Sequence, residues 1–302
     1  MSVNAERIIS EEERLLALQD TLQLHLEQVM PAGAQDDAIM AAMRAATLVP
    51  GKRIRPTLLM LTVQDLGGNP WHADVLHFAA AIEMVHAASL ILDDLPCMDN
   101  ATTRRGQPAL HCQFGESVTI LAAIALLSRA FELLATTALP AEAKAEAVSE
   151  LSRAVGQQGL VQGQFRDLTG APRAVDSSAV TTTNDLKTGV LFEATFQLAA
   201  IASGASAQSR QQLREASAHM GQAFQLLDDL NDERQDTGKD ACQDRGKSTL
   251  VNLLGVSKVR QRLQRHIQRI GSHLDAACQG PNAAGRFLHL WFHKQLARTF
   301  SS

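Results

Sequence analysis

Long apolar helices are the feature that most constrains the fold of this chain. The hydrophobic pattern predicts helices over 72–95 and 116–137 that are apolar almost all round, and helices of that kind have to be buried. Amphipathic helices are predicted before and after them, and no segment shows the alternation of a half-buried strand. Ala, Leu and Gln, which are abundant among the 302 residues, support this assignment. We therefore expect one all-α domain, 1–302, of ten or more helices around the long hydrophobic ones.

The helix over 72–95 ends in an acidic and then a basic cluster: Asp93 and Asp94 are adjacent, Asp99 follows Pro96, and Arg104 and Arg105 come next. Proline disfavours helical geometry in the residue before it, so the helix should loosen near 92–96 and a turn should bring Asp99 back towards Asp93. Carboxylates bind hard cations and arginines bind phosphates. A solvated helix end is the plainer explanation, but this would be an odd end for so apolar a helix. The cluster suggests a site for a metal-bound phosphate with an apolar tail.

A similar pattern recurs 135 residues later. Ser89 to Asp94 reads S-L-I-L-D-D and Phe224 to Asp229 reads F-Q-L-L-D-D, with Asp232 one helical turn beyond Asp228. Two apolar helices with acidic ends could face each other across one space. Their six carboxylates would repel one another, and several Mg²⁺ ions, which favour carboxylates shared with substrate phosphates, would relieve that repulsion. Two unrelated acidic helix ends are the alternative.

Basic residues accompany these clusters. Lys52 and Arg55 open a helix, where backbone N–H groups already favour anions. Lys187 interrupts an apolar helix, and Lys239 and Lys247 lie in or beside a polar stretch, 233–248, that is expected to form an ordered loop or lid. Each of these residues alone would be taken for a surface cation, so only the set indicates anion binding.

Composition excludes several other classes. The net charge of −4 and the pI near 6.2 provide no basic field for nucleic acid. The four cysteines have no zinc spacing and are expected to be reduced thiols in a cytoplasmic protein. The N-terminus lacks an apolar signal segment, and the longest apolar run, about 118–127, is too short to cross a bilayer. No transmembrane segment is therefore expected.

The motifs resemble those of the trans-isoprenyl diphosphate synthases, most closely the geranylgeranyl diphosphate synthases of bacterial carotenoid pathways. The matching motifs are G-K-R-I-R-P at 51–56, D-D-L-P-C-M-D and R-R-G within 93–106, G-Q-F-R-D at 163–167, K-T-G at 187–189, F-Q-L-L-D-D-L-N-D at 224–232, T-G-K-D at 237–240 and G-K-S-T-L at 246–250. The resemblance covers about 40–295, and the first 35 residues carry little of it. It implies an isoprenoid synthase fold around a central apolar cavity, and a homodimer.

The resemblance also implies a role for each matching residue. The diphosphate of isopentenyl diphosphate would be held by Lys52, Arg55, His86 and Arg105. Three Mg²⁺ ions would be bound by Asp93, Asp99 and Asp228, with Asp94, Asp229 and Asp232 in support and Gln164 and Asp167 beside the metal waters. The allylic diphosphate would be held by Arg104, Lys187, Lys239 and Lys247, with Thr188 and Gln225 next to the reacting carbon. The residues expected to act in catalysis are Asp93, Asp94, Asp99, Arg104, Lys187, Thr188, Gln225, Asp228 and Lys239.

The implied activity is prenyl transfer, in which isopentenyl diphosphate condenses with an allylic diphosphate, farnesyl diphosphate in the first place, to give geranylgeranyl diphosphate. Ala88 and Ser89 lie about one turn deeper than Asp93 and are small where, in the family, a large aromatic stops growth at fifteen carbons. Their size predicts a product of twenty carbons or more, with farnesyl diphosphate synthesis as the alternative. The pocket floor would then be Met84, Val85 or Phe131.

The chain departs from the family at Ala123 and Ile124, where many relatives have Gly-Asp, and the change is expected to affect packing or pocket shape.

Other classes of protein fit the sequence less well. A non-catalytic subunit of a heteromeric synthase should lose one acidic cluster, and a class I terpene cyclase needs no second diphosphate site. Glu83 and His86 form half of a di-iron bundle pattern, but no second Glu-x-x-His exists. The sequence at 246–248 resembles the end of a P-loop, yet Ala241 stands where a glycine is required.

Overall fold

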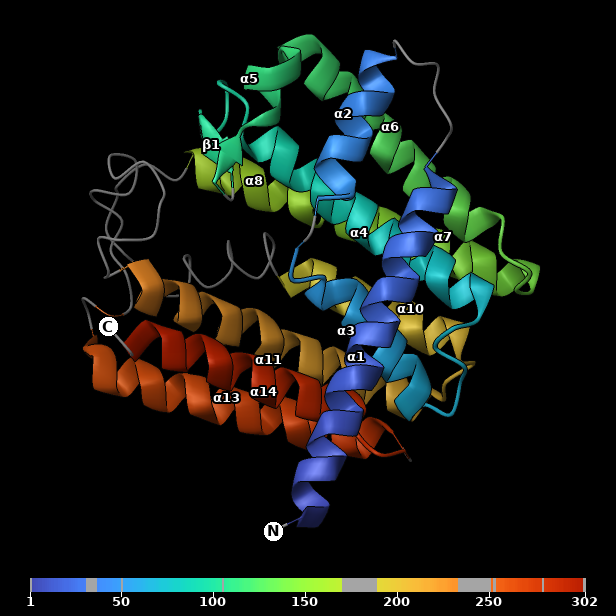
Figure 1. The fold of residues 1–302 in the computed structure, drawn as a ribbon, viewed down its shortest axis with the longest axis vertical. Helices are drawn as coiled ribbons and strands as arrows, with labels where there is room; N and C mark the ends of the chain where they lie inside the picture. Colours follow the sequence, from blue (N-terminus) through green and yellow to red (C-terminus); the bar gives the residue numbers. More distant parts are fainter. Residues whose placement is uncertain are drawn as a thin grey trace.

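The computed structural model describes residues 2–30, 37–49, 51–104, 106–169, 189–232, 251, 254–278 and 280–300. The helices there are α1 (Ser2–Val29), α2 (Ala38–Thr47), α3 (Ile54–Asp65), α4 (Ala73–Asp93), α5 (Leu110–Phe114), α6 (Glu116–Ala135), α7 (Ala141–Val155), α8 (Leu160–Thr169), α10 (Val190–Ala202), α11 (Ala207–Asp232), α13 (Val256–Ala277) and α14 (Ala283–Phe300). The prediction of an all-α fold with ten or more helices is confirmed (Figure 1).

Two local features differ from the sequence expectation. The helix expected from Pro140 to about Leu168 is broken into α7 and α8 at Gly156, whose backbone is extended (φ −71°, ψ −162°). The turn that follows requires a glycine at 159, because a Cβ there would lie 2.0 Å from the carbonyl oxygen of Ala154. A short antiparallel ribbon of β1 (Thr103–Arg104) and β2 (Gln107–Pro108) was not expected either. Its turn includes Gly106, whose φ of 76° is costly for other residues.

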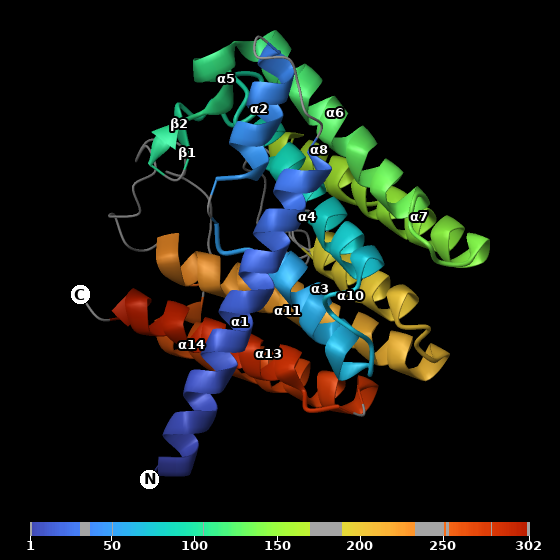
Figure 2. The ribbon, with the colours of Figure 1, turned by 45° about the vertical axis from the view of Figure 1, so that its right-hand side comes forward.

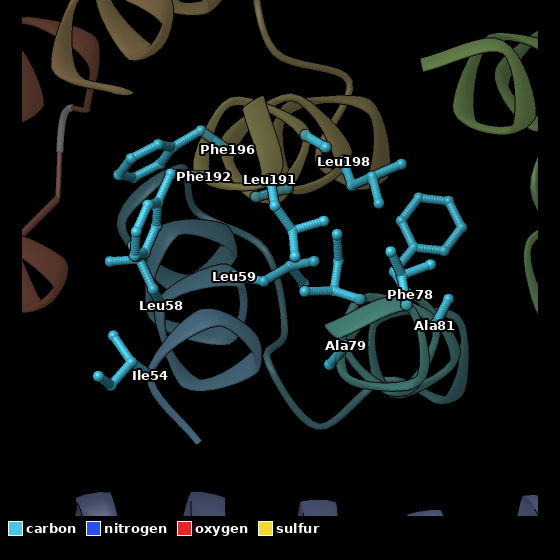
Figure 3. Packing of buried hydrophobic residues seen from close by; sticks show 14 of the residues in the cluster. Ile54, Leu58, Leu59, Phe78, Ala79, Ala81, Leu191, Phe192, Phe196 and Leu198 are labelled. Carbon is cyan, nitrogen blue, oxygen red and sulfur yellow. The ribbon is translucent and has the colours of Figure 1, made fainter. Parts of the chain in front are cut away.

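Three helices form the centre of the core. Figure 3 shows α3, α4 and α10 side by side, with large apolar side chains between them. Leu58 and Leu59 come from α3, Phe78 from α4 and Phe192 from α10, and all four are fully buried. Helix α6 packs along α4 on another side. The apolar helix predicted over 72–95 is thus enclosed by neighbours, as its composition requires. The one predicted over 116–137, α6, is covered on one side only, and 39% of its apolar window is buried.

The C-terminal helices form a second group. Helices α11, α13 and α14 lie alongside one another in Figures 1 and 2, and α14 also packs against α3. Asp65, the last residue of α3, accepts hydrogen bonds of 2.8 Å from the backbone N–H groups of Ala283 and Ala284 at the start of α14. This carboxylate satisfies two N–H donors that have no partner within their own helix and fixes α14 against α3.

Candidate active site

The first acidic cluster lies where α4 ends. The helix stops at Asp93, and Asp94 forms its C-terminal cap, as the proline two residues later predicted. The backbone N–H of Asp99 donates a 2.9 Å hydrogen bond to the carbonyl oxygen of Asp93. The expected turn, which brings Asp99 back towards the helix end, is therefore confirmed.

Arg104 binds Asp94 with one edge of its guanidinium, through Nε and Nη2. Its Nε lies 3.0 Å from each carboxylate oxygen, and Nη2 makes a further, shorter contact with Oδ1. Burial lowers the pKa of Arg104, but the hydrogen bonds and charge of Asp94 and the charges of Asp93 and Asp99 outweigh it, so the pKa is raised. The Asp94 side chain is 3% exposed and that of Arg104 is 34% exposed, so a buried carboxylate is paired with a partly exposed guanidinium. Arg104 is held there by the ribbon of β1 and β2.

The second acidic cluster lies at the end of α11. Asp228 is exposed, whereas Asp229 is buried and accepts a 2.6 Å hydrogen bond from Nε2 of Gln225, one turn earlier. Asp232 is the last residue of the helix, and its side chain lies outside the described part of the structure. The prediction that these acids share one continuous helix is confirmed.

The C-terminal ends of α4 and α11 point to the same side of the molecule in Figures 1 and 2. The donors at the two ends are carboxylate oxygens, the ligands that Mg²⁺ prefers. Within the described ranges, no three acidic, histidine or cysteine side chains already converge as a metal cluster. The donor chemistry therefore fits Mg²⁺, with the two helix ends contributing separately.

A basic pocket lies beside α4, lined by Lys52, Arg53, Ile54, Arg55, Glu83 and His86. The Lys52 Nζ donates a 3.1 Å hydrogen bond to Gln295 and lies 5.6 Å from the ring centre of Trp291, both on α14. The Arg55 guanidinium lies 4.4 Å above the ring of Phe192. The structure thus gathers three of the residues that the sequence predicted to hold one diphosphate.

Two further residues of this pocket, Arg53 and Glu83, were not predicted to take part. They form a buried ion pair with each other. The sequence does contain a signal for this pair, because Glu83 is a carboxylate within an apolar helix and a buried charge needs a partner of opposite sign. The pairing also argues against Glu83 as half of a di-iron site, since its carboxylate is bound by an arginine.

Comparison with known proteins identifies the family of this chain. A model of the polyprenyl synthetase family matches residues 36–278. The chain belongs to this family. It is 52% identical over 286 residues to the geranylgeranyl diphosphate synthase of Pantoea ananas, covering 94% of each chain. It is 49% identical to that of Pseudescherichia vulneris, covering 96% of this chain and 94% of the relative.

A solved structure gives the same result for the fold. The geranyltransferase of Helicobacter pylori, complexed with magnesium and isoprenyl diphosphate, superposes with a TM-score of 0.78 at 28% identity. The alignment covers 94% of this chain and 97% of that one. Polyprenyl synthetases depend on Mg²⁺, which agrees with the all-oxygen donors at the ends of α4 and α11.

Several expected site residues of this polyprenyl synthetase lie outside the described residues: Arg105, Lys187, Thr188, Lys239 and Lys247. The expected lid over 233–248 lies outside them as well. On α8, the amide nitrogen and oxygen of Gln164 are both buried and have no hydrogen-bond partner among the residues that the structure describes. Such an amide can donate a hydrogen bond to a water or ligand and accept one from it, which agrees with the role expected for Gln164 beside the metal waters. Asp167 follows it by three residues on the same helix.

The residues expected to control product length lie on the buried part of α4. Ala88 is fully buried, and the Ser89 hydroxyl donates a 2.9 Å hydrogen bond to the carbonyl oxygen of His86. The proposed floor residues Met84 and Val85 are fully buried on α4, and Phe131 is half-buried on α6. The assignment of the floor stays a prediction.

The departure at 123–124 has a different consequence from the one expected. Ala123 is fully buried, so an effect on packing is reasonable there. Ile124 is 54% exposed, so its side chain faces outwards and does not line an internal pocket. The expectation was wrong for Ile124, because an apolar helix does not show from its sequence which face is covered.

Helices α4 and α6 have the length and hydropathy of membrane-spanning helices. The apolar window of α4 is 72% buried inside the fold, and that of α6 is 39% buried. The core helix of a water-soluble protein passes the same test, so the two helices by themselves do not indicate a membrane protein. The absence of a transmembrane segment stays a prediction.

Proposed function

We propose that this chain is a geranylgeranyl diphosphate synthase, which condenses isopentenyl diphosphate with farnesyl diphosphate. The observation that carries the proposal is the arrangement of α4. His86 in the basic pocket and Asp93 at the acidic end are seven residues apart on this continuous helix. That spacing puts them on one face, about two turns and roughly 10 Å apart. One helix therefore presents a cationic pocket for one diphosphate and carboxylates for the metal ions that would bind the other, as a reaction between two diphosphates requires.

The side chains divide the work as follows. Lys52, Arg55 and His86 hold the diphosphate of isopentenyl diphosphate, and the ring of Phe192 keeps the Arg55 guanidinium in place. Arg104, oriented by Asp94, provides fixed positive charge beside the acidic end of α4. Gln225, hydrogen-bonded to Asp229, offers an amide dipole to the developing allylic cation without adding a charge. The apolar core around α4 excludes water from that cation.

Mg²⁺ belongs to this proposal, with three ions per active site. Asp93, Asp99 and Asp228 would hold them, supported by Asp94, Asp229 and Asp232, with Gln164 and Asp167 beside the metal waters. When bound, Mg²⁺ neutralises the charge of the departing diphosphate. The cations Lys187, Lys239 and Lys247 would hold the same diphosphate, with Arg105 on the other substrate and Thr188 beside Gln225.

The location and pathway are part of the same proposal. Residues 1–302 would act as one catalytic domain in the cytoplasm and supply carotenoid formation. The described cysteines Cys97, Cys112 and Cys278 are all free thiols, which agrees with a reducing compartment.

We also propose that the chain forms a homodimer through α6. Ile120, Leu121 and Ile124 are 38%, 48% and 54% exposed and lie on one face of this helix. Large apolar side chains that gather on one surface mark an interaction site, and a symmetric dimer would cover both copies.

Ile124→Glu is expected to convert the dimer into a monomer, because two carboxylates would be buried near the symmetry axis. Light scattering coupled to size-exclusion chromatography measures the mass. Leu290→Glu is the control, since Leu290 is similarly exposed (53%) but lies on α14. A wild-type monomer, or a dimer that survives Ile124→Glu, would contradict this interface.

The activity is tested in one reaction. Purified protein is incubated with Mg²⁺, labelled isopentenyl diphosphate and farnesyl diphosphate, with and without EDTA, and the dephosphorylated products are sized. We expect a twenty-carbon alcohol that disappears when EDTA is present. A fifteen-carbon product from shorter starters alone would indicate a farnesyl diphosphate synthase. No elongation with any starter of five to fifteen carbons would indicate a non-catalytic subunit.

A further inference from the structure

Arg53 stands in the middle of the basic pocket in a strained conformation. Its φ of 44° places a non-glycine residue in the left-handed region, directly before α3. Such a conformation is unfavourable for a residue with a side chain and persists only where the surroundings hold it. Lys52 precedes this residue and Arg55 follows it by two, so the turn at Arg53 sets how these two cations face the pocket.

The side chain of Arg53 provides what holds the turn. Its Nη2 donates to the carbonyl oxygens of Thr47 (2.7 Å) and Val49 (3.1 Å) and to Oε1 of Gln23 (3.2 Å), while Nη1 donates to Glu83. These acceptors lie on α1, at the end of α2 and on α4. One guanidinium thus fixes the start of α3 to three other segments.

Glu83 joins this network to the opposite wall of the pocket. It lies one turn before His86 on α4, so both side chains lie on the same side of the helix. The Arg53 and Glu83 side chains are each 7% exposed, so the pair is shielded from solvent. An acidic side chain in the wall of a diphosphate pocket would repel the ligand, and the bound guanidinium cancels that charge.

We propose that Arg53 and Glu83 are positioning residues for the homoallylic substrate: their ion pair holds Lys52 and Arg55 opposite His86 and cancels the one negative charge among the described residues that line the pocket. The inference rests on the proposed function and adds two residues to it. Neither residue touches the diphosphate in this scheme. Their effect passes through the placement of the three cations and through the charge of the pocket.

The test separates the two substrates. The KM for isopentenyl diphosphate and the KM for farnesyl diphosphate are measured for the wild type, Arg53→Gln, Arg53→Lys and the double variant Arg53→Gln/Glu83→Gln. Arg53→Gln is expected to raise the KM for isopentenyl diphosphate about tenfold, because Glu83 keeps its charge without a partner, and to leave the other KM within about twofold. The double variant should recover part of this loss, since it removes the unpaired charge of Glu83, whereas the hydrogen bonds to Thr47 and Val49 stay lost.

Arg53→Lys keeps the charge but not the fork of donors, so an increase of about threefold is expected. If Arg53→Gln does not fold, Arg53→Lys and the double variant still test the inference through the two KM values. Arg129→Gln is the matched control: Arg129 donates a 3.0 Å hydrogen bond to the carbonyl oxygen of Val29 and pairs with Glu132, away from this pocket. It should lower the melting temperature and change neither KM.

Equal changes in both KM values, or a double variant no better than Arg53→Gln, would overturn the inference. If the wild type fails to elongate any starter, the proposed function fails, and the pocket is still tested by titration calorimetry with inorganic diphosphate in EDTA. Weaker binding by Arg53→Gln than by the double variant would then support the positioning role. Equal binding would refute it.

Discussion

Asp93→Asn is expected to lower kcat about a thousandfold while leaving the melting temperature nearly unchanged. The carboxylate is proposed to bind Mg²⁺, and an amide is a poor substitute because it lacks the charge. The fold should lose little stability, because Arg104 keeps its direct contact with Asp94 when the nearby charge of Asp93 is removed. The contact that brings the following turn back uses the backbone carbonyl oxygen of Asp93, and asparagine keeps that group. The measurements are kcat under saturating substrates and thermal unfolding.

Two further variants make this result specific. Asp37 caps α2 with its side chain and is exposed, so Asp37→Asn removes a carboxylate elsewhere and should alter neither quantity. Asp94→Asn should reduce both, because it leaves the partly exposed Arg104 without a charged partner, at a cost of about 1–3 kcal/mol. If Asp93→Asn keeps kcat within tenfold of the wild type, Asp93 is not a metal ligand.

Local sequence rules accounted for the parts of the site that depend on neighbouring residues. Pro96 predicted both the end of α4 at Asp93 and the turn that returns Asp99, because the steric effect of proline acts on the adjacent residue. Helical periodicity correctly put the acids of α11 on one continuous helix, but it did not predict that Asp228 would be exposed and Asp229 buried. The grouping of Lys52, Arg55 and His86 came from the family resemblance and not from spacing.

The parts that were missed depend on distant partners or on very short segments. The pairing of Arg53 with Glu83 joins two elements 30 residues apart, and no local pattern states that contact. The ribbon at 103–108 has two residues in each strand, too few to show alternation. The break between α7 and α8 depends on the extended backbone of Gly156 and on how closely Gly159 approaches the preceding turn, which the apolar spacing does not record.

Ala88→Tyr is expected to change the main product from twenty to fifteen carbons. Ala88 lies five residues before Asp93, about 7–8 Å deeper along α4, where the tail of a growing chain would pass. The phenol ring would occupy that space and stop elongation, while the cationic and acidic groups near the mouth stay unchanged. We therefore expect kcat for the first condensation to remain within a few-fold of the wild type. Product sizing after dephosphorylation, with geranyl diphosphate as the starter, measures the change.

Ala87→Tyr provides the matched control, because Ala87 is also buried (5% exposed) but lies about 100° round the helix from Ala88. A tyrosine forced into packed core there should cost about 1–3 kcal/mol of stability and leave a twenty-carbon product. If Ala88 borders the path of the growing prenyl chain, Ala88→Tyr should lower the melting temperature less than Ala87→Tyr does. The two melting temperatures therefore test the position of that path independently of the product sizes. A folded Ala88→Tyr protein that still makes twenty carbons would show that the path runs past another face of α4, and it would move the floor away from Met84 and Val85 towards Phe131.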